Sequence, residues 1–343
     1  MKRQNFTLLV SIIGFLWSTP LYGQTGKNFY EGKVITYLVG STAGGGSDLT
    51  ARLVARHLER HIPGKPRIDV VNKPGAGGMI AMNELYNLRK PDGLSLVPAN
   101  VSALFATAAG NDAIKFDLRK FIWIGQAFDD AQTLYVRSDT PTAASKRSEK
   151  QTKKVNCRKM GAQSLDHTSN VVVKIVGHIL GLEFHVIPGY PGTPQILLDI
   201  ERGALDGRAQ STGSLFATKR EWLQTGYIKP LLTSRKTRDP RTPDLPSIEE
   251  LAPPGSKALL NALHAAQNIS RAVATGPGVP DDRVAILRDA FAAMTRDELY
   301  RKEAEKMGLE ISLIRGEDMN RDVEVTVSDK RLMAMYRTIT EVK

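Results

Sequence analysis

Two glycine-rich segments could bring bare backbone against a ligand. GSTAGGGSD, residues 40–48, follows the apolar run 34–39, and NKPGAGG, residues 72–78, follows the next strand-like run, 67–71. Glycine inside a regular element costs about 0.5–1 kcal/mol relative to alanine, so such loops usually serve a turn or a close approach. Where a helix begins after such a loop, its free N–H groups and its dipole favour an anion. The two segments therefore predict an anion-binding cradle built from main-chain amides.

Nucleotide-binding motifs fail at particular positions of these loops. Gly40 and Gly45 have the spacing of a P-loop, but Gly46 stands where the phosphate-binding lysine is required. Neither loop contains the complete G-x-G-x-x-G fingerprint of dinucleotide-binding proteins. Asp48 would repel a phosphate at the start of the helix, and we interpret it as a cap for backbone amides. No cofactor is therefore predicted.

Catalytic and metal-binding motifs are also missing from the sequence. There is no G-x-S-x-G nucleophile elbow. His57 and His61 have the spacing of two zinc ligands, but Glu59 lies one place too late for a metalloprotease helix. The polar residues of one later turn are too close in sequence to be taken as a catalytic triad: Ser164, Asp166 and His167. The pattern favours a binding protein without metal over an enzyme.

The order of apolar and turn-forming segments predicts an α/β fold. Expected strands cover 34–39, 67–71, 94–98, 121–125, 133–136, 184–187 and 227–233, and expected helices cover 47–62, 79–87, 171–180 and 196–201. A helical tail is expected after residue 281. Alternating strands and helices imply parallel strands, whose carboxyl ends bind ligands in open α/β sheets. Both glycine loops are expected at that edge.

The 343-residue length and the N-terminus indicate an exported protein of two domains. Lys2 and Arg3 precede the apolar stretch 6–17, which is too short to span a membrane, and residues 1–23 are predicted to be a cleavable signal peptide. The single cysteine, Cys157, excludes an internal disulfide. A net charge of +11 favours acidic partners, but export argues against nucleic acid. We interpret the basic run 145–159 as a solvated face or connection.

Taken together, the motifs resemble the receptors of tripartite tricarboxylate transporters, the Bug family. LVGSTAGGGSD (38–48) resembles the family's V-P-F-x-x-G-G-x-x-D loop, and NKPGAGG matches its N-R-P-G-A-G-G with one substitution. KPDG (90–93), PDLPSIEEL (243–251) and the helix after GPGVPDDRV resemble further family segments in the same order. The resemblance covers essentially the whole mature chain.

The resemblance implies a periplasmic solute receptor with two α/β lobes hinged around a cleft that holds a small carboxylate. Lobe 1 is expected to comprise 27–125 and about 232–343, and lobe 2 to comprise 126–231, with part of the C-terminal tail possible on lobe 2. The implied partners are membrane transporter subunits, and the receptor is expected to be a monomer. The resemblance assigns the carboxylate cradle to Thr42, Ala43, Gly44, Gly45, Gly46, Ser47, Pro74, Gly75, Ala76, Gly77 and Gly78, with Asp48 and Asn72 fixing the loops.

The second lobe departs from the family pattern, so the far end of the ligand is left open. Candidate contacts there are Gln163, Ser164, Tyr190, Thr193, Gln210 and Ser211. Two other functions also stay open. A sensory receptor for a membrane signalling partner would have the same cleft, and a secreted enzyme would need an acid or base from Asp48, Asp166 or His167.

Overall fold

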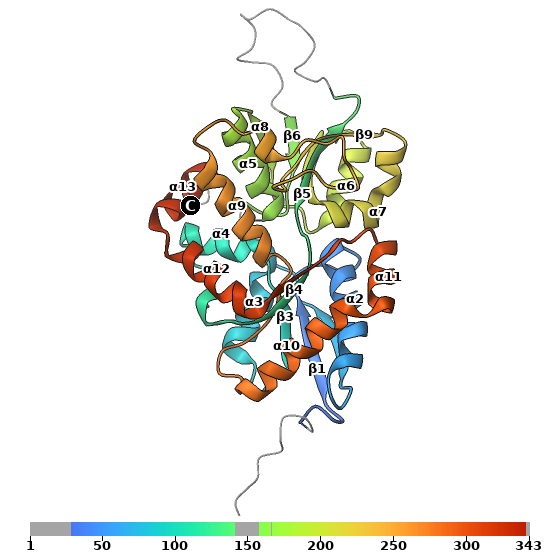
Figure 1. The fold of residues 1–343 in the computed structure, drawn as a ribbon. Helices are drawn as coiled ribbons and strands as arrows, with labels where there is room; N and C mark the ends of the chain where they lie inside the picture. The colour runs from blue at the N-terminus through green and yellow to red at the C-terminus, as the bar shows by residue number, and fades with distance from the viewer. Residues whose placement is uncertain (1–28, 141–157, 166, 341–343) are drawn as a thin grey trace, which may run out of the picture.

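The computed structural model describes residues 29–140, 158–165 and 167–340. The predicted signal peptide, most of the basic run 145–159 and Asp166 lie outside these described residues. The described chain forms two β-sheets, each covered by helices, and the two halves lie one above the other in Figure 1. The predicted two-lobed α/β fold is confirmed.

The first sheet carries both glycine loops. Its strand order is β11-β4-β10-β3-β1-β2. The strands are β1 (Val34–Val39), β2 (Arg67–Asn72), β3 (Ser95–Pro98), β4 (Ile122–Phe128), β10 (Val273–Thr275) and β11 (Ile311–Arg315). β1 pairs in parallel with β2 and β3, but β10 pairs antiparallel with β3 and β4, so the whole sheet is mixed. The parallel part places the ends of β1 and β2, where the glycine loops begin, side by side.

The second sheet has the strand order β7-β6-β8-β5-β9. The strands are β5 (Gln132–Arg137), β6 (Arg158–Gly161), β7 (Phe184–Ile187), β8 (Gly207–Ser211) and β9 (Ile228–Thr233). β6 is parallel to β7 and β8, whereas β5 is antiparallel to β8 and β9. The register pairs Gln132 with Ser211 and Tyr135 with Arg208. The end of β8 therefore lies beside the start of β5, next to the connection with the first sheet.

Helices cover both sheets and bury three apolar cores. Around the first sheet lie α2 (Gly46–His61), α3 (Met79–Leu88), α4 (Val101–Ala109), α10 (Asp281–Arg296), α11 (Glu298–Lys306) and α12 (Gly316–Ser328). Around the second lie α5 (Thr168–Leu180), α6 (Thr193–Glu201), α7 (Thr212–Gln224) and α8 (Ile248–Leu251). Helices α9 (Lys257–Ile269) and α13 (Lys330–Thr340) contact both α4 and α5. The largest core is consequently continuous from one sheet to the other.

Several predicted boundaries agree closely with these elements. The strands at 34–39 and 184–187 have the predicted bounds, and the helix predicted at 47–62 is α2. Helix α7 has no counterpart among the predicted helices, because its first turn contains Gly213 and Ser214, which are weak helix formers. In the part of the chain that the structure describes, no helix has the length and apolar character needed to cross a bilayer.

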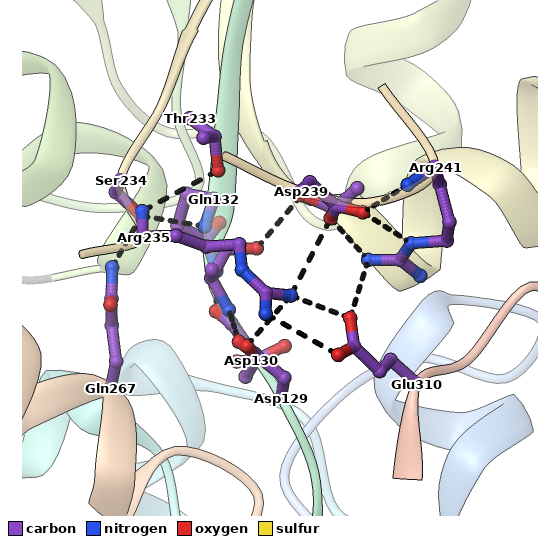
Figure 2. Close-up of polar contacts among 12 residues, drawn as sticks. Asp129, Asp130, Gln132, Thr233, Ser234, Arg235, Asp239, Arg241, Gln267 and Glu310 are labelled. Atoms are coloured by element: carbon purple, nitrogen blue, oxygen red, sulfur yellow. Dashed lines mark hydrogen bonds and ion pairs between the residues drawn. The ribbon is translucent and has the colours of Figure 1, made fainter. Parts of the chain in front are cut away.

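An ion-pair network joins the segments at the boundary between the sheets (Figure 2). The chain enters the second sheet between β4 and β5 and leaves it after β9. The Nη1 atom of Arg235, just after β9, lies 2.9 Å from a carboxylate oxygen of Asp129 and 2.5 Å from one of Glu310. Arg241 lies 2.5 Å from Asp239, whose side chain is fully buried. Three segments that are distant in sequence are thus held together where the lobes meet.

Candidate ligand-binding site between the sheets

A pocket lies between the two sheets at the edge that carries the glycine loops. The wall contributed by the first sheet and its loops consists of 39–42, 45–47, Gly78, 98–100 and 270–271. The wall contributed by the second consists of Gln163, 167–169, 192–193, 208–211 and Ser214. Asp130 and Gln132 join from the connection between β4 and β5. Because both halves supply a wall, a ligand in this pocket would contact both.

The first glycine loop is held from beneath by a buried carboxylate. Asp48 accepts hydrogen bonds from the Gly44 N–H at 2.9 Å, from Arg52 Nε at 3.0 Å and from Asn72 Nδ2 at 2.9 Å. Asn72 also donates to the Ser41 carbonyl oxygen at 2.9 Å. Burial alone would raise the pKa of Asp48, but these hydrogen bonds hold it below its usual value. Both side chains are directed at the loop, and neither lines the pocket.

The second glycine loop adopts a backbone that few side chains permit. Residues 75–78 all have positive φ, between 46° and 131°. Gly78 lies against the first loop, because a Cβ added to Gly40 would come within 2.5 Å of the Gly78 Cα atom. Asn100 fixes the loop by donating to the Gly77 carbonyl oxygen at 2.8 Å. Some of the glycines, such as Gly40, are therefore needed so that the two loops can pack against each other.

The two halves also touch each other across the pocket. A Cβ added to Gly46, in the first turn of α2, would lie 2.0 Å from the Ser214 Oγ atom of α7. A Cβ added to Gly192 would lie 2.6 Å from Thr42 Oγ1. Arg271 donates to Ser214 Oγ at 2.7 Å. Glycine at 46 and 192 thus permits the close approach of the halves in this structure.

Arg271 is a pocket residue whose charge is already neutralised. Its Nε atom lies 2.9 Å from a carboxylate oxygen of Asp130, and both side chains are largely buried. The backbone of Arg271 has a φ of 61°, which is uncommon for a residue with a side chain, and its N–H donates to the Ala99 carbonyl at 2.8 Å. The strained backbone fixes this guanidinium beside the connection between the sheets.

Arg208 is a second pocket guanidinium, and among the residues that the structure describes it has no such counterion. It lies in β8 with only 2% of its surface exposed. Its Nε atom donates to the Ala209 carbonyl at 3.1 Å, while its Nη1 atom is buried without a hydrogen-bond partner. Among the described residues, no Asp or Glu forms an ion pair with it. Burial lowers the pKa of Arg208, although the Tyr135 hydroxyl acts in the opposite direction.

His167 supplies a neutral hydrogen-bond donor next to Arg208. Its Nδ1 atom accepts a hydrogen bond from the Ser169 N–H at 3.1 Å and caps α5. Burial, reinforced by the charge of Arg208, lowers the pKa of His167 to about 3. The imidazole is therefore neutral at physiological pH, and because Nδ1 accepts, the proton lies on Nε2.

The structure brings some of the predicted site residues into the pocket and leaves others outside it. The pocket lining includes Thr42, Gly45, Gly46, Ser47, Gly78, Gln163, Thr193, Gln210 and Ser211. The lining does not include Ala43, Gly44, Asp48, Asn72, Pro74, Gly75, Ala76, Gly77, Ser164 and Tyr190. The Tyr190 hydroxyl donates to Asp199 at 2.7 Å, and the Gln210 side chain bonds Tyr135 and Thr218. The glycine loops thus face the pocket mainly through the first turn of α2.

The four titratable residues of the pocket lining were not among the predicted ligand contacts: Asp130, His167, Arg208 and Arg271. The sequence contains a pattern that could have indicated one of them, Arg208. GRAQS, residues 207–211, is mostly polar yet forms a strand buried along its whole length. A polar run inside an apolar sheet points to a site, because buried polar groups are costly unless they have partners. Within the ranges that the structure describes, no group of three or more His, Cys, Asp or Glu could hold a metal ion.

Two α/β lobes that share a pocket are the architecture of two-lobed solute-binding proteins. Solved structures of such proteins have the same fold as this chain. BugD, a periplasmic binding protein, is 20% identical with a TM-score of 0.70, over 92% of this chain and 99% of that one. MatC from Rhodopseudomonas palustris with bound malate is 18% identical with a TM-score of 0.68, covering 90% and 99%. R. palustris Rpa4515 with adipate is 21% identical with a TM-score of 0.69, covering 90% and 98%.

The family assignment comes from the sequence profile. Residues 50–335 match the tripartite tricarboxylate transporter family receptors, and the chain belongs to this family of binding proteins, which are not enzymes. An Agrobacterium vitis protein, described as a UPF0065 protein in the TAR-I ttuE-ttuC' intergenic region, is 24% identical over 226 residues. That match spans 65% of this chain and 63% of the length of the relative. The resemblance stated from the motifs is confirmed.

Proposed function

We propose that this protein is a periplasmic receptor that captures a small carboxylate between its lobes and delivers it to a tripartite membrane transporter. The lobes would be 27–125 with about 232–343, and 126–231, the C-terminal tail reaching both. Residues 1–23 would direct export and be removed. The membrane subunits of the transporter would recognise the form in which the ligand holds the lobes together.

One observation carries this proposal: the first turn of α2 faces a pocket that both halves enclose. Gly45, Gly46 and Ser47 line the pocket. The first N–H groups of a helix have no partner inside the helix, and the helix dipole adds partial positive charge there. With Arg208 and a neutral His167 on the opposite wall, the pocket offers hydrogen-bond donors and positive charge to an anion. The family relatives MatC and Rpa4515, solved with malate and adipate, support a carboxylate.

A thermal-shift screen of residues 24–343 tests the proposal. The protein would first be unfolded and refolded to remove co-purified ligand, and then heated with mono-, di- and tricarboxylates and acidic amino acids. A ligand at about 100 times its dissociation constant stabilises by roughly 2.7 kcal/mol, which raises Tm by several degrees. We expect a shift with one class of carboxylate and none with the matching amide. No shift across the panel would contradict the carboxylate assignment.

The same material separates transport from a sensing role. Capture of a membrane kinase in place of transporter subunits would indicate sensing.

A further inference from the structure

Arg208 is buried on the second wall of the pocket, and no carboxylate of the described residues pairs with it. Among the described residues, the groups that interact electrostatically with Arg208 include the Tyr135 hydroxyl, which donates to Gln210 at 2.9 Å, and the neutral imidazole of His167. A guanidinium stays protonated in proteins, and an unpaired buried charge is strongly destabilising. Such an arrangement is destabilising in the empty protein and becomes favourable when an anion arrives.

The two arginines of the pocket differ in whether a carboxylate pairs with them. Both guanidiniums line the same pocket, but Arg271 is paired with Asp130 at 2.9 Å and also bonds Ser214. Arg208 donates to the neighbouring Ala209 carbonyl, and among the described residues its Nη1 atom has no hydrogen-bond partner. The pocket therefore keeps one cation available for a ligand and neutralises the other.

The Arg208 backbone lies deeper in the second lobe than the residues that meet the start of α2. Gly46 meets the second lobe at Ser214, just after the end of β8. Arg208 stands three residues before Ser211 in β8, and at about 3.3 Å per residue its Cα atom lies about 10 Å farther along the strand. The pairing with β5 shows that this offset leads away from the first lobe. Ser211 pairs with Gln132 at the connection between the lobes, whereas Arg208 pairs with Tyr135, three residues farther into the second lobe.

We propose that Arg208 is the specificity-determining residue of this receptor, and that it holds a second acidic group at the end of the ligand that faces the second lobe. The inference rests on the proposed carboxylate function and narrows it to ligands with two separated anionic groups. One group would lie at the first turn of α2, and the other would accept the paired N–H donors of Arg208, aided by the Nε2–H of His167. A ligand with one acidic group would leave Arg208 unpaired.

Titration calorimetry with matched acids tests this proposal. The refolded protein would be titrated with each straight-chain dicarboxylate from malonate to adipate and with its own monoamide, which keeps the length and removes one charge. We expect one dicarboxylate to bind at least tenfold tighter than its monoamide. In Arg208→Met this ratio should fall to about one, while the monoamide affinity is kept. Arg208→Lys, which retains the charge, should keep part of the preference.

Two controls keep the outcomes distinct. Arg208→Met should melt at or above the wild-type temperature without ligand, because an unpaired buried charge is removed; if it does not fold, Arg208→Gln replaces it. Arg271→Met should change both affinities by the same factor. Equal binding of dicarboxylate and monoamide by the wild type, or an unchanged ratio in the neutral variants, would overturn the role of Arg208 and leave the carboxylate function standing. If neither acid binds, the proposed function itself fails, and this inference falls with it.

Discussion

At the scale of single residues, the pocket shows how burial sets protonation. His167 and Arg208 are neighbours that a shared anion would bridge, yet in the ligand-free protein they repel each other when both are charged. The fold resolves this by keeping His167 neutral, with its pKa lowered to about 3 from an ordinary value of 6.5. This difference affects stability, because in mild acid His167 binds a proton in the unfolded chain but stays neutral in the folded chain.

Replacing His167 should therefore reduce the loss of stability in mild acid. Between the folded pKa of about 3 and the unfolded value of 6.5, the unfolded state binds more protons, so the free energy of unfolding falls as pH falls. From pH 7 to pH 5 this contribution amounts to about 2 kcal/mol. His167→Asn, which keeps a capping acceptor for α5, should lose that much less stability than the wild type in urea titrations at the two pH values.

His178 provides the matched control for this measurement. It is an exposed histidine on the same helix, so His178→Gln controls for the loss of a histidine side chain from α5. Parallel curves for the wild type and His167→Asn would show that His167 is not held neutral by the fold.

At the scale of elements, the start of α2 combines an anion-binding end with a contact between lobes. The helix begins at Gly46, and Gly45 and Gly46 both line the pocket. Only Gly46 faces the opposite half closely, since a Cβ there would lie 2.0 Å from Ser214 Oγ, while one on Gly45 would be 3.5 Å from its nearest neighbour, the Thr42 carbonyl. Substitutions at these two adjacent glycines therefore distinguish two roles: both positions line the pocket, but only position 46 contacts the other lobe.

Gly46→Ala should weaken ligand binding by tenfold or more without lowering Tm. Alanine suits the helix better than glycine does, but its Cβ would keep α7 from approaching α2. Gly45→Ala has an allowed φ of −76° and no close neighbour in the other lobe, so it should leave the approach of α7 to α2 intact and lose less affinity than Gly46→Ala does. Affinity would be measured by calorimetry with the ligand that the thermal screen identifies. Recovery of affinity in Gly46→Ala with Ser214→Gly would locate the effect at this contact, whereas full affinity in Gly46→Ala alone would show that the contact is dispensable.

At the scale of the whole molecule, the boundary between the lobes is held by charges in addition to the shared apolar core. Arg235 and Arg241 lie among three carboxylates, those of Asp129, Asp239 and Glu310 (Figure 2). Burial raises the pKa of Asp129 despite the hydrogen bond from Ala131 and the charge of Arg235. Removing Arg235 would leave one arginine facing three acids in a largely buried place.

Arg235→Met should destabilise the protein by about 2–4 kcal/mol at pH 7, because breaking a buried ion pair leaves an uncompensated charge. The deficit should shrink as pH falls, since the folded variant can then protonate Asp129. Urea titrations at pH 7 and pH 5 measure both effects. Arg238→Met, which removes an exposed pair with Glu250, should cost at most about 1 kcal/mol. Equal losses in the two variants would mean that the network contributes no more than a surface pair does.

The sequence by itself determined the features that depend on neighbouring residues. Apolar runs and helix periodicity predicted β1 and α2 within a residue or two, because both are local patterns. The two glycine loops and the family motifs indicated where a ligand pocket would form and which class of receptor it belongs to. The loop-fixing role of Asp48 and Asn72 came from the family resemblance, and their hydrogen bonds with the loop agree with it.

Only the tertiary structure decided which charges in the pocket are available. Arg208 and Arg271 are the same residue type, and nothing next to them in the chain distinguishes them. Asp130 neutralises Arg271 because the fold brings together two segments that lie far apart in sequence, while no described carboxylate reaches Arg208. Similarly, the need for glycine at 46 depends on Ser214 in the other lobe. Charge compensation and steric contact depend on distance in space, which residue spacing along the chain does not specify.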